Sequence, residues 1–525
     1  MIYMVESIGL LPVFLVTIAV VLLLIPLICK SRHCTNYVNY IAISSSAVAV
    51  IVSFTILLHV VNNGVTTYFL GGFRPPLGIV YTVDTLSALL GFLSMTILLF
   101  TVLYSTWFIV SKWNYLYYSL LFLMATGSIG CFYTGDIFNL FVALELLTLS
   151  SYGLVAFYRD NPRAITAALR YAISGTIVTS LYFFSVLLIY SAFGTLNMAD
   201  IALKTRDPIA QTPFSHTVPG DIVFASKIAL SIMVWVFLFK SAILPMGFAW
   251  QPQVYAEAPV PIVAGFTAIA DSVGLYLFMR IFNTVFGGDI IPALSSFRTT
   301  LFNFIQVVAS VSALTSALLM TVERDVKKFI AYSTISQFSL AFLGISLDNN
   351  YGLTSAILLI ISNTLGDAIL FYISGVAIAG CGRSVICLAT VRNNKYALLS
   401  LVTAVLNLFG IIPVLVGFWA KALLVLAGIE RSIIFPIAVL VTSGITAIGY
   451  FRLLHISITS RVVLRDDRRL RNTIIPLFLV LVLAVMAIIL GLCFALYEQF
   501  REFILSISIE LTSNYREYID KTLQS

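Results

Sequence analysis

Two stretches of this chain decide its fold: VFLFKSAILPMGFAWQP at residues 236–252 and NLFGIIPVLVGFWAKALL at residues 407–424. Each is part of a long apolar run, and each contains one lysine, Lys240 or Lys421, near a proline. Proline removes a backbone hydrogen-bond donor and clashes with the preceding helical turn. Both runs are therefore predicted to be helices that are broken near their middle.

The predicted breaks lie at Pro245 and Pro413. Broken backbone at membrane depth is tolerated only inside protein or beside a water-filled cavity. A lysine beside such a break lies where membrane transport proteins build their sites. The two stretches thus indicate both a membrane fold and the position of a functional centre.

Composition agrees with a membrane protein. Of 525 residues, 60% are hydrophobic and 10% are charged, whereas soluble proteins carry about 25% charged residues. The formal net charge of +7 is not gathered into a basic patch interleaved with aromatic residues, so no nucleic-acid partner is expected. The partner that the composition predicts is the lipid bilayer.

Fourteen apolar runs are long enough to cross a bilayer, which takes about 20 residues each. They lie near residues 8–29, 38–61, 80–104, 115–134, 136–157, 167–192, 224–249, 259–285, 301–322, 328–346, 353–379, 397–427, 432–455 and 473–497. We therefore predict an all-α, polytopic membrane protein of about fourteen transmembrane helices. The tail from Glu498 is expected to form an amphipathic helix on the surface.

The broken helices are the seventh and twelfth spans, five spans apart. Spans four to eight and nine to thirteen are thus predicted to be repeats, and because five is odd, the repeats are inverted in the membrane. The expected organisation follows in order along the chain: an N-terminal three-helix segment (1–110), the first repeat (111–285), the second repeat (296–457), and the last span with the tail (458–525).

Basic residues in the loops predict the orientation. Seventeen Lys and Arg, among them Lys327, lie in loops on one side of the predicted spans, and nine, among them Lys204 and Arg280, lie on the other. The richer side is cytoplasmic by the positive-inside rule. We expect a multi-pass protein of the cell membrane with both termini outside.

Five ionisable residues lie at mid-span: Glu145, Lys240, Asp271, Asp367 and Lys421. Each costs about 2.5–3.5 kcal/mol at a helix centre on insertion scales, and such residues usually mark ion or proton paths. Pairing between helices is the structural alternative. We interpret the five as a proton-translocation path.

Several motifs together resemble one family. They are GGFRPPLGIVYTVDTLSALL (71–90), DIFNLFVALELLTLSSYGLVAF (136–157), KSAILPMGFAWQPQVYAEAPVPI (240–262), ERDVKKFIAYSTISQ (323–337) and GIIPVLVGFWAKALL (410–424). With them, roughly residues 65–460 resemble the antiporter-like membrane subunits shared by complex I, membrane-bound hydrogenases and Mrp-type cation/proton antiporters. Within this family, the chain is most similar to the D-type subunits of the Mrp antiporters.

The resemblance implies fourteen helices with inverted repeats, and a proton- or cation-translocating subunit that works with other membrane subunits. Glu145 matches the family's fifth-span glutamate, Lys240 its broken-helix lysine and Lys421 its twelfth-span charged residue. The complex is expected to be either an Mrp-type antiporter or a redox-driven pump, such as an NADH:quinone oxidoreductase-like or hydrogenase complex.

Two positions depart from the family pattern. Asp271 and Ser272 stand where the family usually has a lysine in the eighth span, and Asn363 and Asp367 stand where it usually has His and Lys in the eleventh. One hypothesis is an acidic proton relay from Glu145 and Lys240 through both aspartates to Lys421. Another is a sodium site built from hard oxygen ligands, namely Asp271, Ser272, Ser362, Asn363 and Asp367.

Two other functions stay open: a stand-alone carrier for a small solute, and a scaffold that only docks other subunits. No haem motif, iron–sulfur cysteine run or dinucleotide fingerprint is present, so no cofactor or redox centre is expected in this chain. The six cysteines are interpreted as small core residues. Cys29, His33 and Cys34 lack a fourth ligand, so no metal site is expected.

Overall fold

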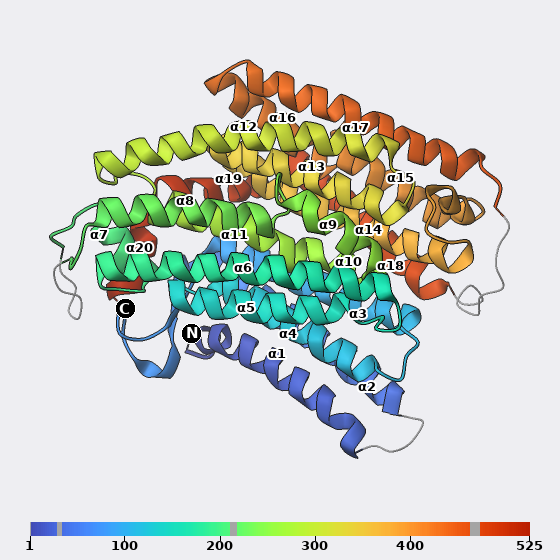
Figure 1. Ribbon diagram of the computed structural model, residues 1–525, viewed down its shortest axis with the longest axis horizontal. Coiled ribbons are helices and arrows are strands. Elements are labelled where there is room, and N and C mark those ends of the chain that lie inside the picture. Colours follow the sequence, from blue (N-terminus) through green and yellow to red (C-terminus); the bar gives the residue numbers. More distant parts are fainter. Residues whose placement is uncertain (1, 29–33, 211–217, 463–472, 525) are drawn as a thin grey trace.

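The computed structural model describes residues 2–28, 34–210, 218–462 and 473–524. Cys29 and His33 lie outside the described residues. Within these ranges, thirteen helices are long and apolar enough to cross a membrane, and they run roughly side by side along the long axis of the molecule (Figure 1). The broken pair α15 and α16 supplies one more crossing, so the prediction of about fourteen transmembrane helices is confirmed.

The helices follow the predicted apolar runs closely. Ahead of the first broken helix they are α1 (Ile2–Ile28), α2 (Cys34–Asn63), α3 (Thr85–Phe108), α4 (Asn114–Tyr133), α5 (Ile137–Val155), α6 (Pro162–Phe193) and the short α7 (Met198–Lys204). After the eighth span come α12 (Pro292–Val322), α13 (Val326–Ser346), α14 (Asn350–Gly380), α17 (Ile434–Thr459) and α18 (Ile474–Leu496).

Both predicted helix breaks are confirmed. The first separates α8 (Ile222–Lys240) from α9 (Gly247–Glu257), and the second separates α15 (Lys395–Phe409) from α16 (Val416–Arg431). Gly410 caps α15 with φ of 74°, a left-handed conformation that glycine adopts without strain. The prolines predicted to cause the breaks lie in the two gaps.

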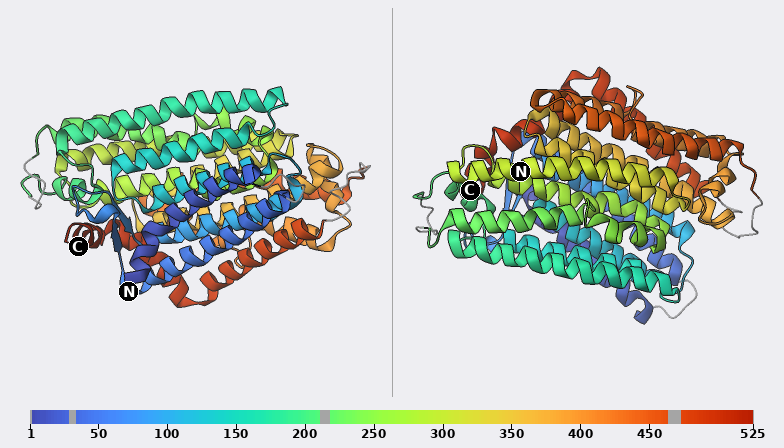
Figure 2. Two further views of the ribbon diagram at one scale, coloured as in Figure 1. Left: turned by 90° about the horizontal axis from the view of Figure 1, so that it is seen from below. Right: turned by 45° about the horizontal axis from the view of Figure 1, so that its top comes forward.

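The two broken helices run in opposite directions. α8 begins at the left of Figure 1, whereas α15 begins at the right. This is the inverted arrangement that the spacing predicted. Both chain termini lie toward the left end, as the further views also show (Figure 2). We call this the termini end of the bundle and the other the far end.

The eighth span is irregular along its length. It consists of α10 (Val260–Phe266), the π-helical segment η2 (Thr267–Asp271), α11 (Ser272–Met279) and the π-helical segment η3 (Arg280–Val285). Its most apolar stretch is completely buried. π-Helical turns occur often at functional sites, and here one of them carries Asp271.

Two features of the fold differ from the sequence-based expectations. A hairpin of β1 (Thr66–Phe69) and β2 (Val80–Val83), with the 3₁₀ turn η1 (Leu70–Gly72) after β1, stands where the third run was predicted to begin. The tail is helical and amphipathic as predicted, forming α19 (Glu498–Thr512) and α20 (Tyr515–Gln524). It nevertheless packs into the termini end, with Ile504, Ile507 and Leu511 buried.

The interpretation of all six cysteines as core residues is wrong. Cys381 and Cys387 form a disulfide directly after α14. The 3₁₀ segment η4 (Val385–Val391) begins inside the loop that the disulfide closes. The sequence did not predict this disulfide, because one pair of cysteines six residues apart does not form the regular spacing by which a disulfide framework is recognised.

Candidate functional site: a line of buried charges

Lys240 is the last residue of α8 and is 4% exposed. Its Nζ has no hydrogen-bond partner among the described residues. The ammonium interacts electrostatically with the carboxylates of Glu145 and Asp271, but neither forms a direct ion pair with it in the described chain. Lys240 thus interacts with two carboxylates that come from different helical segments.

Glu145 lies on α5 and is only half-buried. Thr148, one turn further on, donates its hydroxyl to the carbonyls of Leu144 (2.8 Å) and Glu145 (3.1 Å). The Glu145 side chain is thus partly accessible on α5 and interacts electrostatically with Lys240.

Asp271 is 2% exposed and ends the π-helical segment η2. Its Oδ2 accepts hydrogen bonds from Gln251 Nε2, at 2.9 Å, and from the Tyr255 hydroxyl. The two donors are four residues apart on α9, which places them on one face of the helix. Both come from the half-helix that follows the Lys240 break.

Asp367 is completely buried on α14. Its Oδ2 accepts from the hydroxyls of Thr334 (2.6 Å) and Thr267 (3.3 Å) and from Asn363 Nδ2 (2.9 Å). Thr267 is the first residue of the π-helical segment η2, and Asp271 is its last. The two carboxylates are therefore linked through the Thr267 hydroxyl and one helical turn. All hydrogen bonds described for both carboxylates come from uncharged donors.

Lys421 lies on α16, 6% exposed. Its Nζ donates to the carbonyls of Leu408 (3.0 Å) and Phe409 (2.9 Å). These carbonyls end α15, where the helix dipole is negative and favours a cation. The second broken helix therefore holds its own lysine across its break.

The predicted sodium ligands are divided between different hydrogen bonds. Ser272 donates its hydroxyl to the Ala268 carbonyl, at 2.6 Å on its own helix. Asn363 presents its Nδ2, a donor, to Asp367, and the Ser362 carbonyl accepts from Asn407 at 2.9 Å. Among these candidate ligands, Asn363 Oδ1 and Asp367 Oδ1 are buried and have no hydrogen-bond partner in the described part of the chain.

A buried ion pair at the termini end was not predicted from the sequence. Arg280 Nη2 lies 2.6 Å from Asp84 Oδ2, and both residues are buried. Arg280 lies near the end of an apolar run, which predicts a loop cation, and the same is predicted of Lys204, which pairs inside the protein with Asp200 at 3.4 Å. Local signals existed for Asp84, which caps the first turn of α3, and for Asp200 and Lys204, which are four residues apart on α7.

A polar cluster at the far end was missed for the same reason. Lys327, counted as a loop cation, is 3% exposed and donates to the Ala256 carbonyl at 2.9 Å. Arg383 bridges Glu257 (3.1 Å) and Asp325 (3.3 Å). Lys327, Arg383 and Glu257 line a cavity of about 210 Å³ at the end of α9. Glu257 lies two residues beyond Tyr255, which contacts Asp271.

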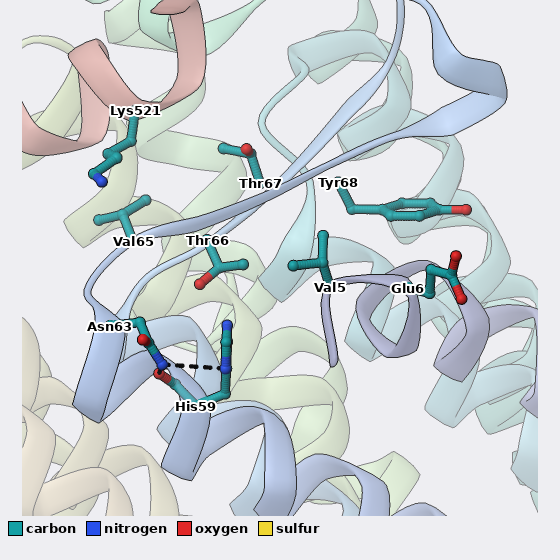
Figure 3. A pocket seen from close by; sticks show the side chains of 9 residues that line it. All are labelled: Val5, Glu6, His59, Asn63, Val65, Thr66, Thr67, Tyr68 and Lys521. Atoms are coloured by element: carbon teal, nitrogen blue, oxygen red, sulfur yellow. Dashed lines mark hydrogen bonds between the residues drawn. The ribbon is translucent and has the colours of Figure 1, made fainter. Parts of the chain in front are cut away.

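A larger pocket of about 470 Å³ opens at the termini end, away from the buried charges. Its walls come from α1, α2, β1 and α20 (Figure 3). His59 and Asn63, 3.2 Å apart, lie on one side of it, and Glu6 and Lys521 come from the two chain ends. Because no mid-span charge lines this pocket, it is separate from the candidate path.

Solved structures share this fold over nearly the whole chain. A chain of an archaeal respiratory complex, the membrane-bound sulfane sulfur reductase, superposes with a TM-score of 0.83 at 23% identity, covering 98% of this chain and 99% of that one. A chain of the Mrp complex from Dietzia sp. gives a TM-score of 0.82 at 20% identity, with the same coverage. At these identities the likeness concerns the fold.

Sequence relatives are similar over about three quarters of their length. NADH-quinone oxidoreductase subunit N of Desulforudis audaxviator is 30% identical over 397 residues, 74% of each chain. The D-type subunit of the Na(+)/H(+) antiporter of Alkalihalophilus pseudofirmus is 28% identical over 396 residues, 74% of this chain and 76% of that one. Residues 134–446 match the family described as NADH:quinone oxidoreductase/Mrp antiporter, transmembrane. This chain belongs to that family.

Proposed function

We propose that this chain is the proton-conducting membrane subunit of a multisubunit complex in a cell membrane, with both termini outside. The single observation that carries the proposal is the succession of ionisable groups on five helical segments inside the bundle: Glu145, Lys240, Asp271, Asp367 and Lys421. Electrostatic interactions link Lys240 to Glu145 and Asp271, and the Thr267 hydroxyl links the helical turn of Asp271 to Asp367. The last step, to Lys421, is part of the proposal.

Lys240 is the switch in this proposal. While it stays near Glu145, the carboxylate favours the charged ammonium. When Lys240 turns toward Asp271, the proton passes from the ammonium to the Asp271 carboxylate, leaving a neutral amine and a neutral acid. The missing hydrogen-bond partner of Lys240 in the described structure supports this role, because no bond to the protein has to break before it moves.

The two aspartates carry the proton onward. The Thr267 hydroxyl lies on the π-helical segment of Asp271 and donates to Asp367. A neutral acid at either position leaves no buried charge, which lowers the cost of holding a proton inside the membrane. From Asp367 the proton moves toward Lys421. In this region the Asn407 side chain donates a hydrogen bond to the Ser362 carbonyl, which joins α14 to the helix before the second break.

Partner subunits supply the driving reaction in this proposal. The named relatives are subunits of a quinone oxidoreductase and of a cation/proton antiporter, and the solved neighbours belong to multisubunit membrane complexes. The half-buried Glu145 gives a neighbouring subunit access to the switch through the face of α5. The far-end cavity beside Glu257 would admit protons from the cytoplasmic side.

The test is proton flux in membrane vesicles that contain the assembled complex. Asp271→Asn and Asp367→Asn should each lower flux about 100-fold, the usual size of a proton-transfer contribution. Ser272→Ala is the matched control, since its hydroxyl only bonds its own helix, and it should leave proton flux unchanged. Normal flux in both asparagine variants would contradict the relay.

The same vesicles separate protons from sodium as the cargo on this path. Under the proton relay, Ser272→Ala and Asn363→Ala leave sodium flux unchanged. A sodium site that used these side chains as ligands would lose sodium flux in both variants while the proton relay stayed intact. That outcome would assign a sodium site to these side chains beside the proton relay.

A further inference from the structure

The C-terminal helices form part of the termini end, where the transfer path has to open. α19 contacts the start of α14 twice: Ser508 lies 3.1 Å from the Thr354 hydroxyl, and Thr512 donates to Asn350 at 3.0 Å. The neighbouring Ser355 donates to the Ala420 carbonyl on α16, at 2.7 Å. One short stretch of α14 therefore joins α19 to the residue before Lys421.

Glu510 is the half-buried acid of this region. Its Oε1 accepts from the Thr85 hydroxyl at 3.1 Å. Thr85 is the first residue of α3 and follows Asp84, whose carboxylate forms the buried ion pair with Arg280. A single hydroxyl therefore separates Glu510 from the end of the transmembrane bundle.

The charged groups around Glu510 come from three elements. Asp84 lies at the start of α3, Arg280 on η3 and Glu517 on α20. The contacts from α14 are uncharged. Arg280 is already committed to Asp84, and the Tyr518 ring of α20 lies 4.7 Å from its guanidinium. The surroundings of Glu510 therefore contain two carboxylates, Asp84 and Glu517, and one cation, Arg280, which is already paired.

We propose that Glu510 is the terminal proton-exchange group at the termini end, positioned by the Asp84–Arg280 pair through Thr85. The inference rests on the proposed function and extends the path by one residue from outside the predicted spans. A proton that leaves the buried relay binds the Glu510 carboxylate, and the acid then gives it to water. Burial, with the Asp84 carboxylate nearby, raises the pKa of Glu510 to about 7, which suits exchange with water near neutral pH.

The experiment compares four variants of the assembled complex in vesicles, with proton flux recorded by a pH-sensitive dye. Glu510→Gln should lower flux at least tenfold. Glu510→Asp, which keeps a carboxyl, should restore most of it with a shifted dependence on the pH of the termini side. Glu502→Gln is the matched control, an exposed glutamate on the same helix, and should behave as the parent. Lys240→Ala reports separately on the relay itself.

Each result decides one question. Glu510→Gln at full flux, with Lys240→Ala inactive, overturns the inference and leaves the proposed function standing. Glu510→Asp as slow as Glu510→Gln also overturns it, because carboxyl titration is then not the cause. Lys240→Ala at full flux overturns the relay on which both proposals rest.

Discussion

Arg280 and Lys240 are both cations buried inside the bundle, and their surroundings are opposite. Arg280 has a carboxylate at 2.6 Å, the Tyr276 and Thr284 hydroxyls at 3.3 Å each, and an aromatic ring over its guanidinium. Lys240 has two carboxylates in electrostatic reach and no hydrogen bond in the described chain. Arg280 is therefore held by several fixed partners, whereas Lys240 has none within hydrogen-bond distance among the described residues, as the proposed proton switch requires.

The largest expected effect on stability comes from breaking the saturated pair. Arg280→Ala leaves Asp84 as an uncompensated buried charge, which costs about 3–5 kcal/mol. Chemical unfolding of the detergent-solubilised protein should show this loss. Lys240→Ala removes an unpaired buried cation and should cause no loss. Equal destabilisation by both substitutions would remove the contrast between the two sites.

Lys421 lies between these extremes and sharpens the comparison. Its Nζ is bonded to two carbonyls at the end of α15 but faces no carboxylate at contact distance in the described residues. Lys421→Ala leaves those carbonyls without a donor. We expect this to lower the free energy of unfolding by about 1–3 kcal/mol. The same unfolding measurement checks this. A variant as stable as the parent would mean that the carbonyl contacts contribute little.

The smallest effect concerns the pH dependence of tail docking. Burial and Asp84 raise the Glu510 pKa from its ordinary 4.5 to about 7, so the docked tail favours the protonated acid. Stability from docking is full below pH 4.5 and is lost as pH rises to about 7.

Hydrogen exchange of the α20 amides tests this dependence. After correction for the intrinsic pH dependence of exchange, protection should fall on the order of tenfold between about pH 5 and pH 7. Glu510→Gln should remove the pH dependence, and Glu502→Gln should keep it. Flat protection across this range in the parent protein would contradict the raised pKa.

The sequence predicted the spans and both breaks because these depend on local properties: apolar length, and proline or glycine inside it. It also singled out Lys240 and Asp271, since a charge far from either end of an apolar run is conspicuous. Arg280 and Lys327 were misassigned because a charge at the edge of a run looks like a loop residue. Their partners are distant in sequence: Asp84 lies 196 residues before Arg280.

Other parts of the molecule could be predicted only in part. The amphipathic pattern of the tail predicted a helix from Glu498, but nothing local indicated that Glu510 would meet Thr85, 425 residues away. The hairpin was hidden because its second strand, Val80–Val83, is as apolar as the helix that follows it. The Cys381–Cys387 disulfide depends on how the end of α14 turns, which hydropathy does not encode.

One measurement tests the central claim most directly: proton flux through the assembled complex carrying Lys240→Ala, beside Lys227→Ala as a matched lysine near the end of the same helix. We predict a loss of about 100-fold or more for Lys240→Ala, with normal assembly, and parent flux for Lys227→Ala. Parent flux in an assembled Lys240→Ala complex would contradict the relay.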